Sequence, residues 1–402
     1  MKEPFFSVVI PTKGRSAIVG GAIRSVLRQT FSDFELIVCD NDDGDATEKV
    51  TRQFNDLRLR HYRTGGLSMP DNWEAACGAA KGRFLVILED KQALRGRALE
   101  RIHAELQKQD AECVRWLVDV LDDTASPTYV EQERCSGESR LMSSQECLRL
   151  FVHGTPGDAW RTAPIGHLSA ISRALLDRIR SQPPFRVCPP AAPDYCLAIL
   201  ALAHTKQVLA IDASLVAQTR KHSNGRSISM KTALGQQFAQ ELGGDRLLYH
   251  RVPIAARVNF NVIWNDYVGL FEILGDKLSA YPMDIPNYFA HCFEGIAGSD
   301  AQGVDMAAEW LAWQTAFEKQ PAGEKLRIEA LLTERFGPPA KRQRKAAYKK
   351  FKRRTGLLAL EDGWRGLTRR ISGRKLAGRF QSAIEYVEWM DRQESPELFS
   401  AQ

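Results

Sequence analysis

The chain has 402 residues, which is more than one simple core usually contains and favours two or three domains. Hydrophobic residues make up 44% and charged residues 26%, a globular balance that excludes a disordered chain. No run of ~18 apolar residues occurs, and the first residues lack the apolar stretch of a secretory signal. We therefore expect neither a membrane-spanning helix nor export.

The net charge of +6 is concentrated in one segment. Residues 341–354 (KRQRKAAYKKFKRR) hold nine Lys or Arg and no acid, so the rest of the chain carries −3. Such a segment is typical of an anchor on an anionic membrane surface, or simply of a solvated helix face. A nucleic-acid partner is not expected, because no recognised module surrounds the segment. The eight cysteines are scattered without metal-binding spacing, which is typical of buried thiols in the cytoplasm.

Strand and helix patterns alternate over the first 95 residues, as expected of a parallel sheet. Short apolar runs predict strands at Phe6–Ile10, Glu35–Cys39, Leu57–Tyr62, Arg83–Leu88, Cys113–Val120, Leu168–Ser172 and Val208–Asp212. Beyond about residue 234 helical patterns replace the strand patterns. We therefore predict an α/β domain over residues 1–234 and a helical domain over residues 235–402. The apolar stripe from Leu376 to Met390 predicts a helix that packs in a core or against a partner.

Polar residues follow three of these strands directly. They are Thr12 and Lys13, then Asp40, Asn41 and Asp42, then Glu89 and Asp90. Ligands of open α/β sheets bind outside the carboxyl ends of the strands, so these positions predict a binding site. The alternative is that the acids only cap loops and helix starts. No G-x-G-x-x-G or P-loop motif occurs, which counts against dinucleotide and P-loop functions.

Three segments, SVVIPTKGR, SVLRQTFSDFELIVCDN and NWEAACGAAKGRFLVILED, resemble the beginning of family 2 glycosyltransferases in order and spacing. The resemblance covers roughly residues 5–95 and continues more weakly to about residue 230, whereas residues 235–402 resemble no family that we can name. It implies a GT-A-like mixed sheet flanked by helices, with a helical C-terminal domain. The implied reaction is inverting transfer of a sugar from a nucleotide-sugar to an acceptor hydroxyl, in bacterial-type polysaccharide or glycoconjugate synthesis.

By this resemblance, the residues expected to bind the nucleotide-sugar are Pro11, Thr12, Lys13, Arg15, Asp40, Asn41, Asp42, Asn72 and Lys91. Asp40 would accept hydrogen bonds from the nucleobase, and Lys13 and Arg15 suit diphosphate oxygens. Arg15 could instead be a solvated surface charge. Trp73 is expected to pack under the sheet.

The family usually ends its fourth strand with an Asp-x-Asp-Asp cluster that holds Mn²⁺ or Mg²⁺ on the diphosphate, but this chain has Glu89-Asp90-Lys91-Gln92. Three interpretations stay open. Glu89 and Asp90 bind the cation, with His222 as a further ligand unless that residue is only a solvated loop histidine. Alternatively, Lys91 supplies the positive charge, so that the cation is weakly needed or dispensable. Finally, the site is degenerate and the protein is a non-catalytic nucleotide- or glycan-binding scaffold.

The resemblance also implies a general base near the start of a downstream helix, and Asp194 fits that position. An acid in the first turn of a helix is equally typical of helix-dipole stabilisation. The implied partners are a nucleotide-sugar donor and a glycan or lipid-linked acceptor. We expect a location in the cytoplasm, possible contact of residues 341–354 with the inner face of the membrane, and possible self-association through the C-terminal helices.

Overall fold

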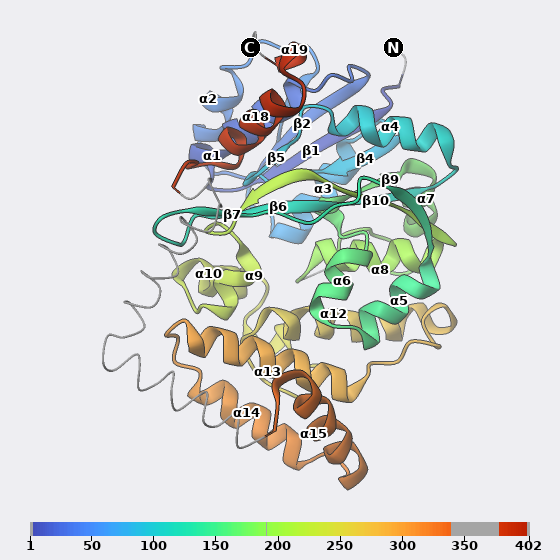
Figure 1. The fold of residues 1–402 in the computed structure, drawn as a ribbon, viewed down its shortest axis with the longest axis vertical. Coiled ribbons are helices and arrows are strands. Elements are labelled where there is room, and N and C mark those ends of the chain that lie inside the picture. The colour runs from blue at the N-terminus through green and yellow to red at the C-terminus, as the bar shows by residue number, and fades with distance from the viewer. Residues whose placement is uncertain (1–2, 190, 339–377, 400–402) are drawn as a thin grey trace.

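The computed structural model of the protein describes residues 3–189, 191–338 and 378–399. Within these residues, ten strands form one mixed sheet that has helices on both faces (Figure 1). The strands are β1 (Phe6–Thr12), β2 (Phe34–Asp40), β3 (Leu59–Arg63), β4 (Phe84–Ile87), β5 (Gln92–Leu94), β6 (Cys113–Asp122), β7 (Tyr129–Glu131), β8 (Ser139–Ser143), β9 (Ser169–Ser172) and β10 (Gln207–Thr219).

The helices alternate with these strands up to β10 and then follow one another. Those before β10 are α1 (Ser16–Leu27), α2 (Ala46–Thr51), α3 (Met69–Ala79), α4 (Ala98–Lys108), α5 (Ser144–His153), α6 (Pro156–Thr162), the 3₁₀ turn η1 (Gly166–Leu168), α7 (Arg173–Arg180) and α8 (Pro193–His204). Those after it are α9 (Asn224–Ser229), α10 (Ala233–Glu241), α11 (Asp245–Leu248), α12 (Asn259–Leu274), the 3₁₀ turn η2 (Gly275–Lys277), α13 (Ile285–Ala301), α14 (Ala307–Glu318), α15 (Ala322–Phe336), α18 (Ala383–Glu394) and α19 (Pro396–Phe399). None of the described helices is both long and apolar enough to cross a bilayer.

The strands lie in the order β3-β2-β1-β4-β9-β6-β10-β5, with β7 paired to β6 and β8 paired to β10. The pairs joining β3, β2, β1 and β4 are parallel, as is the pair of β6 and β10. Strand β9 is antiparallel to both of its neighbours. All seven residues of β1 are buried, which explains its nearly continuous apolar sequence, because a parallel strand is covered on both faces.

The seven strands that the sequence predicts are all present, and most of their ends shift by only one or two residues. Strand β10 is the largest departure, since it continues to Thr219. Strands β5, β7 and β8 were not predicted. They have three to five residues and pair antiparallel with β10 or β6, so the pairing of distant segments defines them.

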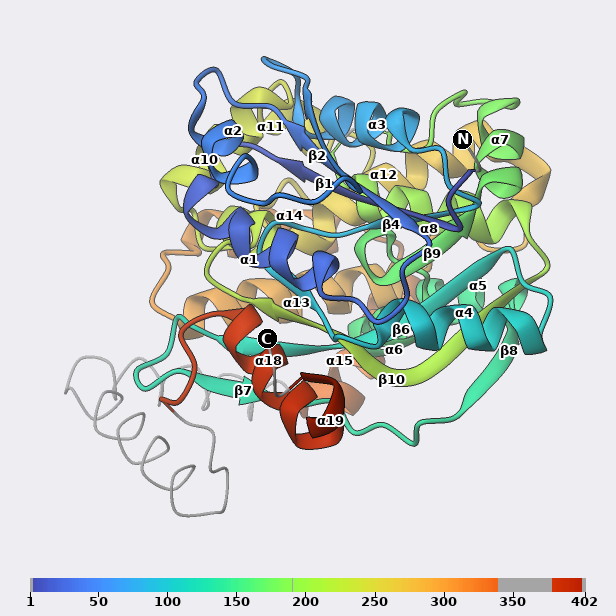
Figure 2. The same ribbon diagram turned by 90° about the horizontal axis from the view of Figure 1, so that it is seen from above.

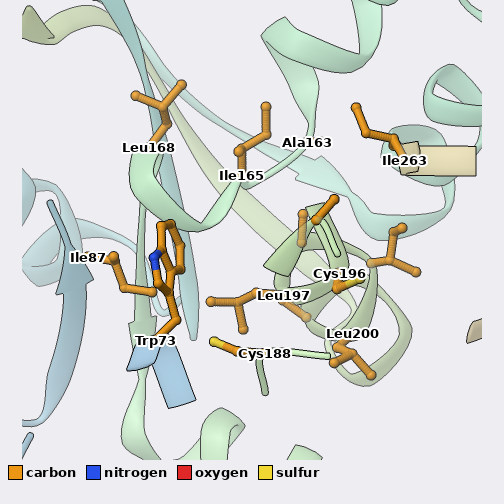
Figure 3. Close-up of a cluster of buried hydrophobic side chains, with 14 of the residues drawn as sticks. Trp73, Ile87, Ala163, Ile165, Leu168, Cys188, Cys196, Leu197, Leu200 and Ile263 are labelled. Carbon is orange, nitrogen blue, oxygen red and sulfur yellow. The ribbon is translucent and has the colours of Figure 1, made fainter. Parts of the chain in front are cut away.

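One buried apolar cluster runs from β1 through α8 to α15. Figure 3 shows part of it, where Trp73 and Ile87 meet Leu197 of α8, and Ile263 of α12 belongs to the same group. The burial of Trp73 confirms that this ring packs as expected. The predicted boundary near residue 234 therefore falls within a continuous core, and the division of the chain into two domains stays a prediction.

The last helix returns to the sheet. Figures 1 and 2 show α18 beside α1, and Figure 1 shows it at the opposite end of the molecule from α13, α14 and α15. Phe380, Ala383, Tyr386 and Val387 are buried there against residues of β5, β6, β7 and β10. This confirms core packing for the described part of the last apolar stripe. Residues 341–354, with their basic side chains, lie outside the described residues.

Candidate functional site

A cleft of about 510 Å³ opens at the carboxyl ends of β1, β2 and β4. The sequence-predicted residues that line it are Pro11, Thr12, Lys13, Arg15, Asn41, Asp42, Asn72, Glu89, Asp90 and His222. A smaller hollow of about 130 Å³ contains Lys91 and Asp194. Glu89 and Trp73 line both spaces, so the cleft and the hollow adjoin.

The loop between β1 and α1 forms one wall of the cleft. Gly14 has a φ of +66°, a conformation that glycine adopts without strain, and its N–H donates a hydrogen bond to Asp42. The other oxygen of Asp42 accepts a hydrogen bond from Thr47 of α2 at 2.7 Å. Asp42 therefore fixes the loop after β1 to the loop after β2, at the height where both strands end.

Asp40 lies behind the residues that line the cleft. Its side chain has no exposed surface, and Oδ2 lies 2.9 Å from His61 Nε2 while Oδ1 accepts the N–H of Asp42 at 3.0 Å. Asp40 is not among the lining residues, and each of its oxygens has a partner within the protein. It orders the wall from behind, and its contact with a nucleobase stays a prediction.

Asn41 and Asn72 brace the segment that leads into α3. The Asn41 amide donates to the carbonyl of Leu67 at 2.7 Å and accepts the N–H of the same residue at 2.9 Å. Thr64 donates to Asn72 Oδ1 at 2.7 Å. The two amides line the cleft as predicted, but they also hold its wall together.

Arg15 lies at the start of α1, and its side chain forms hydrogen bonds across the cleft. Its Nη1 donates to Asp90 Oδ1 at 2.8 Å, and its Nη2 donates to Asn224 Oδ1 at 2.8 Å. Thr12 donates to the second oxygen of Asp90, also at 2.8 Å. Arg15 is therefore not the solvated surface charge considered as an alternative, since its side chain is only 15% exposed.

Glu89 is surrounded by positive groups. Lys91 Nζ lies 3.0 Å from its Oε2, and His167 Nε2 lies 3.8 Å from the same atom. Burial alone would raise the pKa of Glu89, but Lys91, His167 and Arg15 outweigh it and hold this pKa at about 2. The amide of Gln92 accepts the backbone N–H of Glu89 at 2.9 Å, so Gln92 shapes the turn after β4.

A divalent cation needs ligand atoms that are free to bind it. Both oxygens of Asp90 are engaged by Thr12 and Arg15, and Glu89 is paired with Lys91. Within the described parts of the chain, no three His, Cys, Asp or Glu side chains gather in a way that could hold a metal ion. His222 lines the cleft but adds no third ligand there, so the predicted set of Glu89, Asp90 and His222 does not fit a divalent cation in this arrangement.

Asp194 lies in the first turn of α8, at the edge of the smaller hollow. The residue before the helix is Ala192, whose side chain cannot cap it, so Asp194 is the acid of the first turn. His167 Nδ1 lies 3.4 Å from Asp194 Oδ2, too loosely aligned for a hydrogen bond. A Cβ at Gly166 would lie 3.2 Å from the Asp194 Cα, so this glycine permits the close approach of η1 to α8.

The segment before Asp194 is held by Asp266 of α12. Asp266 Oδ2 accepts the N–H of Ala192 at 2.7 Å and lies 3.4 Å from Cys196 Sγ. Burial raises the pKa of Asp266 to about 7, although these hydrogen bonds and Arg251 act in the opposite direction. A helix from the C-terminal part of the chain thus positions the start of α8.

Helix α10 supplies another wall of the cleft. Leu234, Gln237, Phe238 and Glu241 line it, and Glu241 forms an ion pair with Lys13 at 3.0 Å. The cleft is therefore built from both sides of the predicted boundary at residue 234.

Several residues of the site were not predicted from the sequence. The register of the parallel strands β2 and β3 would have revealed His61. This residue lies on the same face of the sheet as the residue of β3 that pairs with Asp40. His167, Asn224, Glu241 and Asp266 carried no local signal. Each reaches the site only because distant elements pack together.

A mixed α/β sheet with a polar cleft at the carboxyl ends of its parallel strands defines a class of protein that binds its ligand at this sheet edge. Residues 7–144 match the family model described as glycosyl transferase family 2. This match agrees with the resemblance drawn from the three segments, and the mixed sheet flanked by helices and the helical C-terminal region are present as predicted.

Curated relatives also match part of the chain. A GalNAc(5)-diNAcBac-PP-undecaprenol beta-1,3-glucosyltransferase of Campylobacter jejuni is 31% identical over 103 residues, which is 25% of this chain and 33% of that protein. The UDP-Glc:alpha-D-GlcNAc-diphosphoundecaprenol beta-1,3-glucosyltransferase WfgD of Escherichia coli is 30% identical over 93 residues, which is 22% of this chain and 36% of WfgD. The chain thus spans about a third of the length of these two relatives.

A solved structure is also similar. TarS 1–349 of S. aureus in complex with UDP-GlcNAc has a TM-score of 0.44 and 14% identity, over 87% of this chain and 92% of TarS 1–349.

Proposed function

We propose that the protein is a glycosyltransferase that moves a sugar from a nucleotide-sugar to an acceptor hydroxyl with inversion. The observation that carries the proposal is the position of Asp194. This carboxylate lines the hollow that adjoins the family 2 cleft, and Glu89 belongs to both spaces. A donor in the cleft and an acceptor in the hollow would therefore meet beside Asp194.

In this reaction Asp194 accepts the proton of the acceptor hydroxyl. The oxygen attacks the anomeric carbon of the donor sugar from the side opposite the diphosphate, and the bond from that carbon to the diphosphate oxygen breaks. Trp73 and Trp160 line the hollow and offer apolar ring faces to sugar rings, while Glu89, Lys91 and Asp194 are among its polar groups.

The names of the two relatives suggest the substrates. One name gives UDP-Glc as the donor, and both describe glycans on undecaprenyl diphosphate. We therefore propose a UDP-hexose donor and an acceptor linked to a polyprenyl diphosphate. With such an acceptor the enzyme would act at the cytoplasmic face of a membrane. Residues 341–354 would supply a basic contact with anionic lipid there. We also propose that the protein associates with itself through the C-terminal helices.

The experiment begins with calorimetric titration of the full chain with UDP, GDP, CDP, dTDP and the corresponding nucleotide-sugars. The expected result is binding of one nucleotide, preferentially UDP, and weaker binding by Arg15→Ala. Arg52→Ala is the matched control, because Arg52 lies on α2 with its side chain 76% exposed and outside the cleft. A radiolabelled donor that binds is then incubated with a GlcNAc-diphosphopolyprenol acceptor, and labelled lipid is counted.

Nucleotide binding together with transfer to the acceptor, both lost when the cleft is altered, supports the proposal. Nucleotide binding without transfer or donor hydrolysis would favour the alternative of a non-catalytic nucleotide- or glycan-binding module. Binding of no nucleotide by the folded protein would refute the proposal.

A further inference from the structure

We propose that Arg15 and Lys91 take the place of a divalent cation, so that the diphosphate of the donor is bound by protein cations alone. The inference rests on the proposed function, since it concerns the donor of that reaction. It starts from the finding that the two acids after β4 are already paired.

The first pair removes Asp90 from the set of free ligands. The side chains of Asp90 and Arg15 are 5% and 15% exposed, and their ion pair is 2.8 Å long. Thr12 occupies the second carboxylate oxygen. A cation that bound Asp90 would have to displace both partners, and moving Arg15 would also break its hydrogen bond to Asn224.

The second pair places a positive charge beside Glu89, whose Oε2 makes no hydrogen bond to the described residues. Lys91 is buried, with its side chain 7% exposed, and its ammonium group lies 3.0 Å from the carboxylate. The lysine therefore stands inside the acidic turn, where the family resemblance leads one to expect another acid. A divalent cation at this turn would meet two buried positive charges at close range, which disfavours its binding.

The same two side chains retain donors for an anion. Arginine has five N–H donors, and two of those of Arg15 are hydrogen bonded to described residues. The ammonium group of Lys91 has three donors, one of which faces Glu89. Arg15 lines the cleft, Lys91 lines the hollow, and Glu89 belongs to both. A diphosphate at the junction would lie between the two cations.

Such a pair would also stabilise the leaving group. As the bond to the sugar breaks, negative charge grows on the diphosphate, and fixed positive groups at that point lower the barrier. Lysine acts as a point charge and arginine as a planar donor, and both recognise phosphate oxygens. A bound metal ion is therefore not required for this charge to be neutralised.

The first test is calorimetric titration of the full chain with UDP and the other nucleoside diphosphates, in EDTA and again in Mn²⁺. The expected result is a Kd that differs by less than about twofold between the two conditions. UMP should bind more weakly than UDP, because it lacks the second phosphate. A Kd that improves by more than tenfold in Mn²⁺, or binding lost in EDTA, would overturn the inference.

The second test exchanges the protein cation for a metal ion. Lys91→Ala should weaken UDP binding in EDTA by about tenfold or more, since a charged hydrogen bond is lost. It also leaves Glu89 unpaired, so Mn²⁺ should restore much of the affinity in this variant and not in the wild type. Arg52→Ala should behave as the wild type does, and thermal unfolding checks that each variant is folded.

The outcomes separate the two proposals. Nucleotide binding that depends on Mn²⁺ in the wild type overturns the inference and leaves the proposed function standing. Absence of binding by all four nucleoside diphosphates, in EDTA and in Mn²⁺, removes both. A Lys91→Ala variant that binds UDP as tightly as the wild type in EDTA also overturns the inference.

Discussion

The carboxylate of Asp194 and the imidazole of His167 lie side by side at the edge of the hollow. We predict that replacing each of them has a different effect on catalysis. Asp194 is in the first turn of α8 with its side chain 23% exposed, so its replacement should change chemistry more than folding. His167 is buried between Asp194 and Glu89, at 3.4 and 3.8 Å from their nearest oxygens. It can orient both acids without touching the substrate.

Asp194→Asn should lower kcat by about 10² or more, because the amide cannot accept the hydroxyl proton. The Kd for UDP should stay within about twofold of the wild-type value, since the proposed nucleotide site is the adjoining cleft. Steady-state transfer assays and calorimetry check the two parts. Asp177→Asn on the exposed side of α7 is the control. A variant that keeps wild-type kcat would show that Asp194 is not the base.

His167→Asn should lower kcat by about tenfold with little change in donor affinity, because Asp194 loses a neighbour that holds it in position. The pH profile of kcat should also shift, which a purely structural effect would not produce. His153→Asn is the matched control, since His153 forms a similar pair with Asp284 at 2.7 Å outside both spaces. An unchanged kcat and pH profile would contradict this role.

At the scale of elements, helix α18 depends on one buried acid. Asp391 is 3% exposed, and its Oδ2 accepts hydrogen bonds from Arg28 Nη1 at 2.7 Å and from the N–H of Gly96 at 3.0 Å. Arg95 Nε lies 3.4 Å from Oδ1. The acid therefore joins α18 to α1 and to the segment after β5.

Asp391→Ala should lower the free energy of unfolding by about 3–5 kcal/mol, because two largely buried arginines lose their partner. Gln393→Ala, at an exposed position of the same helix, should change it by less than about 0.5 kcal/mol. Urea unfolding measures both variants. If the two variants are equally stable, α18 is not anchored through Asp391.

The elements also show how far sequence reasoning reaches. Strand β4 and the acids after it could be predicted, because an apolar run followed by acids is a local pattern. The contacts of Glu89 and Asp90 could not be predicted in full. Lys91 is close in sequence, but Arg15 and His167 reach these acids from other elements. The contact between Asp40 and His61 was missed for the same reason.

At the scale of the whole molecule, Asp266 couples the C-terminal helices to the site. Its pKa rises from an ordinary value of 3.8 to about 7 because it is buried, and the hydrogen bonds from Ala192 and Cys196 only partly oppose this rise. Below pH 3.8 the carboxyl is protonated in both states. As pH rises towards 7 the unfolded chain ionises first, so this group's contribution to stability is lost over that window.

Asp266→Asn should remove this pH dependence. The free energy of unfolding of the variant, relative to the wild type, should rise between pH 4 and pH 8 by roughly 2–4 kcal/mol. Urea unfolding of both proteins at the two pH values measures the difference. Asp276→Asn, at an exposed position in η2, should show no such change. A constant difference would mean that Asp266 ionises normally in the folded protein.

The sequence by itself determined the sheet and the edge at which its polar residues gather, because these follow from local periodicity and from strand ends. It also pointed to Thr12, Arg15, Glu89 and Asp194. Only the tertiary structure decided which distant charges meet. Arg15 with Asp90 and His167 with Asp194 are contacts made by packing. Packing also brings α10 and α12 to the site and α18 to the sheet, although the sequence separates these helices from it.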